Sequence, residues 1–266
     1  LKKIDDYLSK NNNTNMEFIF VDDGSDVPII DKIPLNKNIK ILRNKKNSGY
    51  GFSIKMGAKE AKNEILAIID ADDSYDLNFL IEKIEKYDKE VDLLVGKRNF
   101  LYDEGLVRKT YRFMLNKISS VLCNYSIRDL NSGLRIFKKN FFLENLKYFP
   151  DGFSLTSTQT LTYVLQNKKI VYEETSYSKR SGKSKINLLK DPFNFIFLIL
   201  KVYILISPLS FFSWTGVFFI ILSLILGVFT YIIFESIADI SVLLLFLTGI
   251  NFILFGLIAE SIRLKK

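Results

Sequence analysis

Two long runs without charged residues lie near the carboxyl end of this chain and restrict what it can fold into. The first extends from Val202 to Phe234 and the second from Ile240 to Ala259. About 20 apolar residues cross the hydrocarbon core of a bilayer, so each run is long enough to cross it once. Neither run is N-terminal, so neither is a signal peptide. We therefore predict a transmembrane hairpin over residues 209–266.

The charges around this hairpin predict its orientation. The loop between the expected spans, at about 211–234 and 240–259, carries Glu235 and Asp239, whereas Lys and Arg residues flank the pair on both sides. Basic flanks remain in the cytoplasm, which predicts a multi-pass membrane protein with a cytoplasmic catalytic domain and C-terminus. The net charge of +8 also favours contact with anionic membrane lipids. We expect no nucleic-acid partner, because the sequence contains no nucleic-acid-binding motif.

A further apolar segment, 191–208, precedes the hairpin. It contains Asn194 and Lys201 and ends at Pro208, a pattern that predicts an amphipathic helix lying in the membrane interface. A third membrane crossing is the alternative for this segment. Small residues in the two spans permit close helix contact within one chain or between two, so a homo-oligomer remains open. These residues are Gly216, Gly227, Gly249 and Gly256.

Residues 1–190 alternate between short apolar runs and amphipathic stretches. We expect an α/β fold with a parallel or mostly parallel sheet and helices on both faces. The expected strands lie at about 17–21, 39–42, 65–69 and 92–95, and the expected helices at about 1–9, 47–62, 77–88 and 107–124.

Two of the expected strands end in paired carboxylates, Asp70-Ala71-Asp72 and Asp22-Asp23. Ligands of open α/β sheets bind at the carboxyl ends of the strands. Two Asp residues at i and i+2 can approach one hard cation, and that cation can hold a diphosphate. The chain has no His and one Cys, so a metal would be held by oxygen, which favours Mg²⁺ or Mn²⁺. The alternative for Asp70 and Asp72 is that they cap the next helix.

Six short segments carry a resemblance that covers most of the chain. They are Val21–Asp26, Asn47–Gly57, Asp70–Asp72, Gly96–Arg98, Asp129–Arg135 and Arg180–Lys185. In this order they resemble the motifs of family 2 glycosyltransferases of the dolichyl-phosphate mannose synthase and polyprenyl-phosphate glycosyltransferase type. Each segment alone is a weak signal, whereas six in the family's order followed by a membrane hairpin are a strong one.

The resemblance implies a fold and a reaction. Residues 1–190 would form a GT-A domain, the Rossmann-like fold of nucleotide-diphospho-sugar transferases. The protein would move a single sugar, with inversion, from a UDP- or GDP-linked donor to undecaprenyl or dolichyl phosphate at the cytoplasmic membrane face. Asp70 and Asp72 would hold Mg²⁺ or Mn²⁺, with Asp72 the catalytic ligand. The nucleotide would be bound by Asp22, Asp23, Gly49 and Asp70.

The resemblance also implies a site for the acceptor phosphate. Arg98 and Arg108 match positions that hold the lipid phosphate in the family, and Lys109 and Arg112 compete for the role of Arg108. Asp129 lies where the family places a residue near the acceptor. It would orient groups rather than remove a proton, because a lipid phosphate is already mostly dianionic at neutral pH. The other acceptor-phosphate candidates are Arg135, Arg180, Ser184 and Lys185.

One feature of the family is absent from the start of this chain. Family members begin with a strand that carries a Pro-x-Tyr-Asn-Glu-type motif, whereas this chain begins at Leu1, in what looks like the helix after that strand. We therefore expect the first strand of the domain to be missing. The strands ending at Val21 and Asp70 should then be separated by a gap one strand wide and should not pair with each other.

Three other functions remain open. A processive polysaccharide synthase shares the fold, but its Gln-x-x-Arg-Trp motif has no match, since Trp214 is the one tryptophan and lies in a span. A glycosyltransferase with a hydroxyl acceptor would need Asp129 as a general base. The third is a non-catalytic, membrane-anchored protein that binds a sugar nucleotide.

Overall fold

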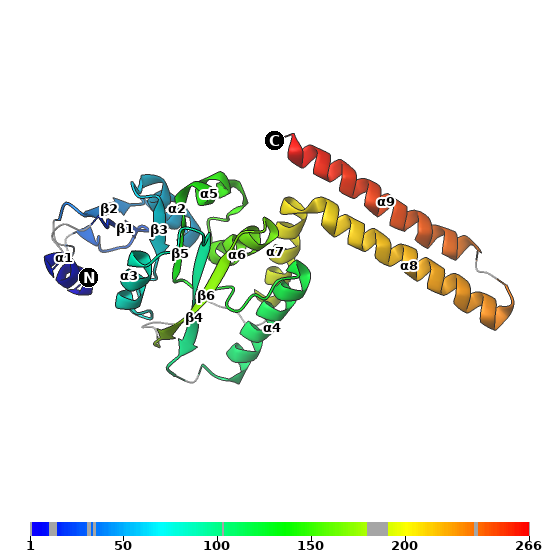
Figure 1. The fold of residues 1–266 in the computed structure, drawn as a ribbon, viewed down its shortest axis with the longest axis horizontal. Helices are drawn as coiled ribbons and strands as arrows, with labels where there is room; N and C mark the ends of the chain where they lie inside the picture. The colour runs from blue at the N-terminus through cyan, green and yellow to red at the C-terminus, as the bar shows by residue number, and fades with distance from the viewer. Residues whose placement is uncertain are drawn as a thin grey trace. The chain divides into compact units, whose positions relative to one another are not determined.

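The computed structural model describes residues 2–10, 15–30, 33, 36–102, 104–179, 191–236 and 239–265. The chain divides into two compact units, Leu1–Ile199 and Leu200–Lys266 (Figure 1). The first unit has an α/β fold and the second is helical. The boundary between the units lies within one helix, α7 (Asp191–Ile206).

The first unit contains two sheets. In the smaller sheet, β1 (Phe18–Asp22) and β2 (Ile39–Arg43) pair in parallel. The larger sheet has the order β3-β5-β4-β6. Its strands are β3 (Ile65–Ile68), β4 (Leu93–Phe100), β5 (Arg135–Lys138) and β6 (Ile170–Tyr177).

The larger sheet is mixed. β4 and β6 are parallel, whereas β5 runs antiparallel to both of its neighbours, β3 and β4. Three strands therefore share one direction, as we expected of a mostly parallel sheet, and β5 is inserted among them in the opposite direction. Neither β5 nor β6 was predicted from the sequence.

Helices cover both faces of the larger sheet, as predicted. On one face, Leu94 and Ile136 pack in a core cluster with Leu80 and Ile81 of α3. On the other face, the Phe137 ring contacts Phe142 of α5. The helices of this unit are α1 (Lys2–Lys10), α2 (Tyr50–Glu60), α3 (Leu77–Glu85), α4 (Leu106–Cys123), α5 (Lys139–Glu144) and α6 (Leu155–Leu165), with a 3₁₀ turn at Leu146–Tyr148.

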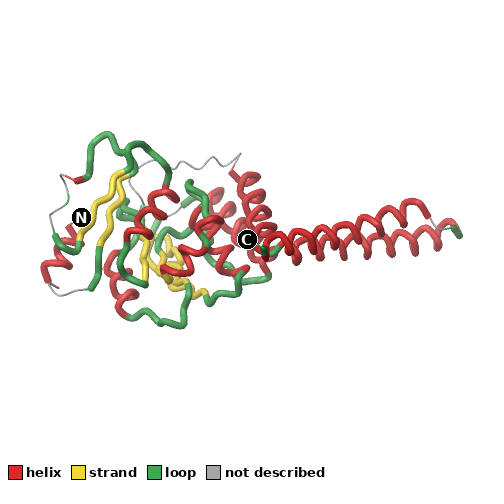
Figure 2. The backbone as a smooth tube through the Cα atoms, turned by 90° about the horizontal axis from the view of Figure 1, so that it is seen from above, coloured by secondary structure: helices red, strands yellow, loops and turns green. Residues whose placement is uncertain are grey.

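β1 and β3 belong to different sheets. Among the described residues β1 pairs with β2 and β3 pairs with β5, and no ladder joins β1 to β3. Figure 2 shows β1 and β2 as a pair set apart from the other strands. The expectation that β1 and β3 do not pair with each other is therefore confirmed for the described residues.

The second unit is dominated by α8 (Pro208–Phe234) and α9 (Asp239–Leu264), which lie side by side in both views (Figures 1 and 2). Both are long and apolar enough to cross a membrane. They include the predicted spans and extend beyond them. The helices meet at small residues: the Ser223 hydroxyl donates to the Val242 carbonyl at 2.8 Å. α7 is helical as expected, and its place in the membrane interface remains a prediction.

Candidate active site

The loop after β1 is organised by Asp22. This buried carboxylate accepts hydrogen bonds from the backbone N–H groups of Ser25 at 2.9 Å and Ile29 at 3.3 Å. The Arg43 Nε atom lies 3.5 Å from its Oδ2 atom. The hydrogen bond from Ser25 is the main reason that the pKa of Asp22 is below its usual value. Asp22 therefore forms the turn after the strand, and a contact with a nucleotide remains a prediction.

The neighbouring carboxylate, Asp23, holds the loop that leads into α2. It accepts hydrogen bonds from the backbone N–H groups of Ser48 and Gly49, both at 2.9 Å, and from Asn44 Nδ2 at 2.7 Å. Burial raises the pKa of Asp23, but these hydrogen bonds outweigh it and lower the pKa. The Gly49 N–H is therefore bonded to the protein, and any contact of Gly49 with a nucleotide would use other atoms.

The glycines at the start of α2 allow a close approach between two parts of the chain. A Cβ atom on Gly49 would lie 2.5 Å from the Asp151 carbonyl oxygen, and one on Gly51 would lie 2.9 Å from the Asp151 carbonyl carbon. Gly49 also has φ +105°, a conformation that favours glycine. The close approach at these glycines is therefore made to the backbone around Asp151.

Asp70 lies just beyond the end of β3, between two other segments. The Tyr50 hydroxyl of α2 donates to Asp70 Oδ1 at 3.3 Å. On another side, the Asp70 carboxylate lies against Gly133, where a side chain would overlap it. Burial and the nearby Asp70 charge raise the pKa of Tyr50 well above its usual value, so Tyr50 remains a hydrogen-bond donor.

Asp72 bonds within its own loop, accepting hydrogen bonds from the Ser74 backbone N–H at 3.1 Å and from the Ser74 hydroxyl. The N-cap of α3 is Asp76, which accepts from Asn78 N–H at 2.9 Å. Neither Asp70 nor Asp72 caps α3, so the capping alternative is wrong for both.

The donor set at this edge fits a hard cation. The described residues contain no group of three or more His, Cys, Asp or Glu that could hold a metal by themselves. Mg²⁺ is usually bound by one or two carboxylates together with substrate phosphates and water. Asp70 and Asp72 are carboxylates of this kind, and their binding of a cation remains a prediction. Gly133 has no side chain and so leaves room for the Asp70 carboxylate.

A buried ion pair lies further along the sheet, between Arg98 of β4 and Asp129. Arg98 Nε donates to Asp129 Oδ2 at 2.9 Å and Nη2 donates to Oδ1 at 2.7 Å, while the Arg98 backbone N–H adds a third bond at 3.1 Å. The Asp129 side chain is 1% exposed and that of Arg98 is 15% exposed. Burial raises the pKa of Asp129, but the Arg98 charge outweighs it, so the pKa of Asp129 is below its usual value.

Arg112 is the second arginine of this region. Its guanidinium lies 4.5 Å from the centre of the Phe100 ring, and the Arg98 guanidinium lies 5.5 Å from the same ring. Arg112 also pairs with Glu104. Arg108, by contrast, is exposed on α4. Arg112 and Arg98 therefore contact the same ring, and the phosphate-binding roles of Arg108 and Arg112 remain predictions.

The expectation that Arg135 holds a phosphate is wrong for this structure. Its side chain has no exposed surface. Its Nε and Nη2 atoms donate to the carbonyls of Ser132 and Leu130, both at 2.8 Å, and Nη1 donates to Thr160 Oγ1 at 2.8 Å. With all three nitrogen atoms bonded to the protein, Arg135 fixes the segment before β5 against α6.

The remaining predicted residues, Arg180, Ser184 and Lys185, lie outside the described residues. Tyr50 and Tyr75 were not predicted from the sequence, because Tyr50 occupies a variable position of its motif and Tyr75 lies outside the motifs. Tyr75 OH lies 3.2 Å from Ser132 Oγ and accepts from the Gly133 N–H at 2.8 Å. The sequence signal for Tyr50 is its place between Gly49 and Gly51, and that for Tyr75 is its position three residues after Asp72.

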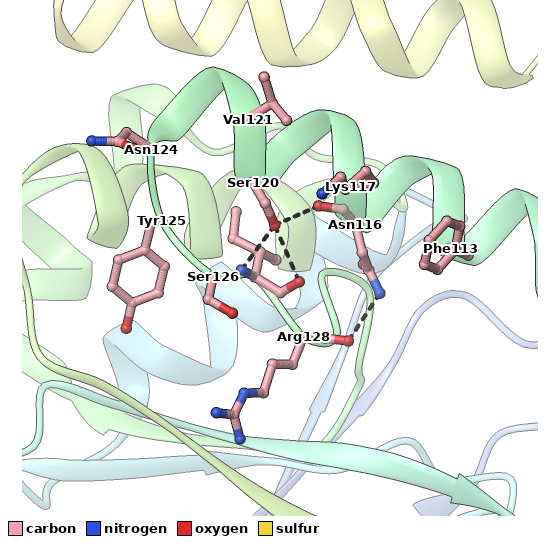
Figure 3. A pocket seen from close by; sticks show the side chains of 10 residues that line it. Phe113, Asn116, Lys117, Ser120, Val121, Asn124, Tyr125, Ser126 and Arg128 are labelled. Atoms are coloured by element: carbon pink, nitrogen blue, oxygen red, sulfur yellow. Dashed lines mark hydrogen bonds between the residues drawn. The ribbon is translucent and has the colours of Figure 1, made fainter.

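A separate hollow of about 600 Å³ lies on the C-terminal half of α4 and the loop that follows (Figure 3). Inside it, Asn116 Nδ2 donates to the Arg128 carbonyl at 2.9 Å, and Ser120 Oγ accepts from Ile127 N–H at 3.0 Å. These bonds join the loop to the helix. No predicted site residue lines this hollow, so it is not the candidate site. Its lining is Phe113, Asn116, Lys117, Ser120, Val121 and Asn124–Arg128.

The chain is similar to several known proteins. It is 27% identical over 208 residues to an uncharacterized protein of Methanocaldococcus jannaschii, covering 69% of this chain and 89% of that protein. It is also 27% identical over 159 residues to the dolichyl-phosphate beta-glucosyltransferase of Dictyostelium discoideum, covering 52% of this chain. That alignment spans 47% of the Dictyostelium protein, about half of its length.

A solved structure shows the same fold. It is glucosyl-3-phosphoglycerate synthase from Mycobacterium tuberculosis, in complex with Mn²⁺, UDP and glucosyl-3-phosphoglycerate, with a TM-score of 0.52 at 14% identity. The match covers 75% of this chain and 73% of that one.

Two family models match the chain in succession. The GtrB C-terminal hairpin matches residues 207–263, which include α8 and most of α9. Glycosyl transferase family 2 matches residues 2–159, which include the carboxylates after β1 and β3 and the Arg98–Asp129 pair. The chain belongs to glycosyl transferase family 2.

Proposed function

We propose that this protein transfers one sugar, with inversion, from a nucleotide-diphosphate sugar to a polyprenyl phosphate at the cytoplasmic membrane face. The observation that carries the proposal is the succession of a family 2 domain and a GtrB-type hairpin in one chain. The relative in Dictyostelium, named for glucosyl transfer to dolichyl phosphate, supports the choice of acceptor. The sugar and the carrier, undecaprenyl or dolichyl, are left open.

The donor would bind at the carboxyl ends of β1 and β3. The UDP and Mn²⁺ in the structure of the mycobacterial synthase support a nucleotide–metal site in this fold, with UDP or GDP as the nucleotide. Asp70 and Asp72 would hold the Mg²⁺ or Mn²⁺. When bound, such a cation neutralises charge on the diphosphate leaving group. Asp22 and Asp23 shape the loops on which the nucleotide would lie.

The acceptor would be held near Arg98. Nε and Nη2 of Arg98 are used by Asp129, whereas Nη1 has no hydrogen-bond partner among the described residues, so it can donate to a phosphate oxygen. That oxygen attacks the anomeric carbon, the bond from this carbon to the diphosphate breaks, and the new bond forms on the opposite face. No proton is transferred, because a lipid phosphate is already an anion.

The bonding of Asp129 favours a phosphate acceptor over a hydroxyl acceptor. A hydroxyl acceptor would need a general base within hydrogen-bond reach. Asp129 already accepts three hydrogen bonds from Arg98, and its pKa is lowered, so it is a poor base. In this proposal Asp129 positions Arg98.

Membrane attachment completes the proposal. The two long apolar helices and the hairpin match support insertion into a bilayer. The basic flanks of the hairpin support a cytoplasmic location for the family 2 domain and the C-terminus. A polyprenyl phosphate would then be presented at the same surface to which the domain is attached.

The proposal can be tested by measuring the release of nucleoside diphosphate by the membrane-embedded protein over a panel of UDP- and GDP-sugars. Each sugar would be offered with polyprenyl phosphate, with the matching polyprenol, and with no acceptor. We expect nucleoside diphosphate to be released only when polyprenyl phosphate is the acceptor offered. Equal release with the polyprenol would indicate a hydroxyl acceptor and contradict the proposal.

A further inference from the structure

We propose that Tyr50 and Gly133 are positioning residues that hold the Asp70 carboxylate from two sides, so that it is fixed before a metal–nucleotide complex binds. The inference rests on the proposed function, because it assigns Asp70 to the metal. It extends that function to two residues outside the carboxylates and arginines described above. A rigid ligand binds a cation more tightly than a mobile one, because less freedom is lost on binding.

The Tyr50 side is built by α2. Tyr50 is the first residue of this helix, and its hydroxyl donates to Asp70 Oδ1 at 3.3 Å. Its ring stacks on Phe153, with ring centres 5.8 Å apart and an angle of 11° between the planes. The stacking fixes where the hydroxyl points.

The glycines of this segment explain why Tyr50 reaches that place. Gly49 and Gly51 let the start of α2 approach the backbone around Asp151 so closely that a Cβ atom would overlap it. Phe52 N–H then donates to the Asp151 carbonyl at 3.0 Å. This packing joins α2 to the segment that carries Phe153. Gly49 and Gly51 therefore help to position the Tyr50 hydroxyl, which bonds to Asp70.

The Gly133 side is built by the segment before β5. If Gly133 had a Cβ atom, its three nearest neighbours would all be atoms of the Asp70 carboxylate, the furthest at 2.7 Å. The backbone here is held in place: Gly133 N–H donates to Tyr75 OH at 2.8 Å, and Ser132 Oγ donates to the Gly96 carbonyl at 2.6 Å. Gly133 thus gives Asp70 a fixed surface to lie against.

The geometry predicts different effects of substitution at the two residues. Tyr50→Phe retains the ring and its stacking but removes the hydrogen bond to Asp70. Gly133→Ala adds a methyl group where the carboxylate lies, and because the carboxylate is the end of a side chain, it is Asp70 that would move. Both changes should weaken metal binding while the fold is retained.

The test is Mn²⁺ binding to the purified full chain in detergent, read from the electron paramagnetic resonance signal of the free ion. Parallel titrations would contain UDP or GDP. We expect Tyr50→Phe to raise the dissociation constant about tenfold, as loss of a residue that supports a metal ligand typically does. The matched control is Tyr87→Phe, which removes a hydroxyl bonded to the Val91 carbonyl at 2.7 Å and should leave Mn²⁺ binding unchanged.

Two further variants separate the possible failures. Asp70→Asn should weaken Mn²⁺ binding, and Tyr50→Phe added to Asp70→Asn should have no additional effect, because Tyr50 acts through Asp70. If Asp70→Asn weakens binding but Tyr50→Phe does not, the positioning role is wrong and the proposed function stands. If Asp70→Asn binds Mn²⁺ like the unmodified protein, the metal assignment itself is wrong. If Gly133→Ala shows no cooperative thermal unfolding and is therefore not folded, the Mn²⁺ affinity of Tyr50→Phe alone decides whether Asp70 is held in position.

Discussion

The Arg98 guanidinium meets the Asp129 carboxylate through two parallel hydrogen bonds, from Nε to Oδ2 at 2.9 Å and from Nη2 to Oδ1 at 2.7 Å. Both side chains are buried or nearly so. Pairs with this geometry are stronger and more directional than a contact between point charges. The pair joins β4 to the segment before β5, and Nη1 of Arg98 has no hydrogen-bond partner among the described residues, which is why we propose it as the donor to the acceptor phosphate.

Asp129→Asn should destabilise the protein. Removal of one partner of a buried ion pair leaves the other charge unpaired and typically costs about 3–5 kcal/mol. The measurement is thermal or chemical unfolding in detergent. Glu174→Gln is a suitable control, because it removes the exposed ion pair of Glu174 with Lys97, next to Arg98, and should have little effect. Equal stability of the two variants would contradict the assigned role of the buried pair.

The stabilisation from Asp129 should depend on pH. Its folded pKa is below the unfolded value of about 3.9, so the unfolded state takes up protons first as the pH falls. The stabilising contribution is therefore fully present above about pH 4 to 5 and is lost as the pH falls through the folded pKa. The difference in melting temperature between the unmodified protein and Asp129→Asn should be constant from pH 7 to about 5 and shrink below it. A difference unaffected by pH down to 3 would exclude Asp129 as its source.

Arg98→Lys should impair use of the acceptor more than use of the donor. A lysine keeps the positive charge, but its single ammonium cannot form the two-bond pair with Asp129 and also bind a phosphate in the same geometry. We expect the acceptor KM to rise and the donor KM to change little. Lys97→Ala, a change to the neighbouring residue on the same strand, is the control. A larger rise in the donor KM would assign Arg98 to the nucleotide.

The elements that could be predicted from sequence are those with a plain apolar pattern. β1, β3 and α8 are examples, because their burial or membrane location requires apolar residues. β5 was missed because it begins with a buried arginine, and an arginine predicts an exposed position. α6 was missed because its buried face is rich in hydroxyl and amide groups, at Thr156–Thr160.

The same limit applies to the site. The carboxylates after β1 and β3 were found because their position follows from the strand pattern. The role of Arg135 could not be found, since a lone arginine that bonds to backbone carbonyls and one that binds phosphate look the same in a sequence. The support of Asp70 by Gly133 depends on two segments distant in sequence.

Gly216→Ala should destabilise the hairpin. A Cβ atom on Gly216 would lie 2.6 Å from the Gly249 carbonyl oxygen on α9, so the helices would have to separate, at a cost of about 1–3 kcal/mol. Gly227→Ala is the matched control, because its Cβ atom would lie at an ordinary 3.6 Å from Val242 Cγ2. Thermal melts in detergent should show a lower melting temperature for Gly216→Ala and an unchanged one for Gly227→Ala. An equal melting temperature for both would contradict the packing of α8 on α9.

The most direct test of the proposed function is the transfer of a radiolabelled sugar from its nucleotide into chloroform-extractable lipid by the membrane-embedded protein. If the proposed function is right, label should enter the organic phase, and it should do so only when polyprenyl phosphate and Mg²⁺ or Mn²⁺ are present. We also predict that Asp72→Asn abolishes this label without lowering the melting temperature much, because an amide lacks the charge that holds the cation. The contradicting result is undiminished transfer by Asp72→Asn at the same metal concentration, or label that never enters the lipid with any UDP- or GDP-sugar offered.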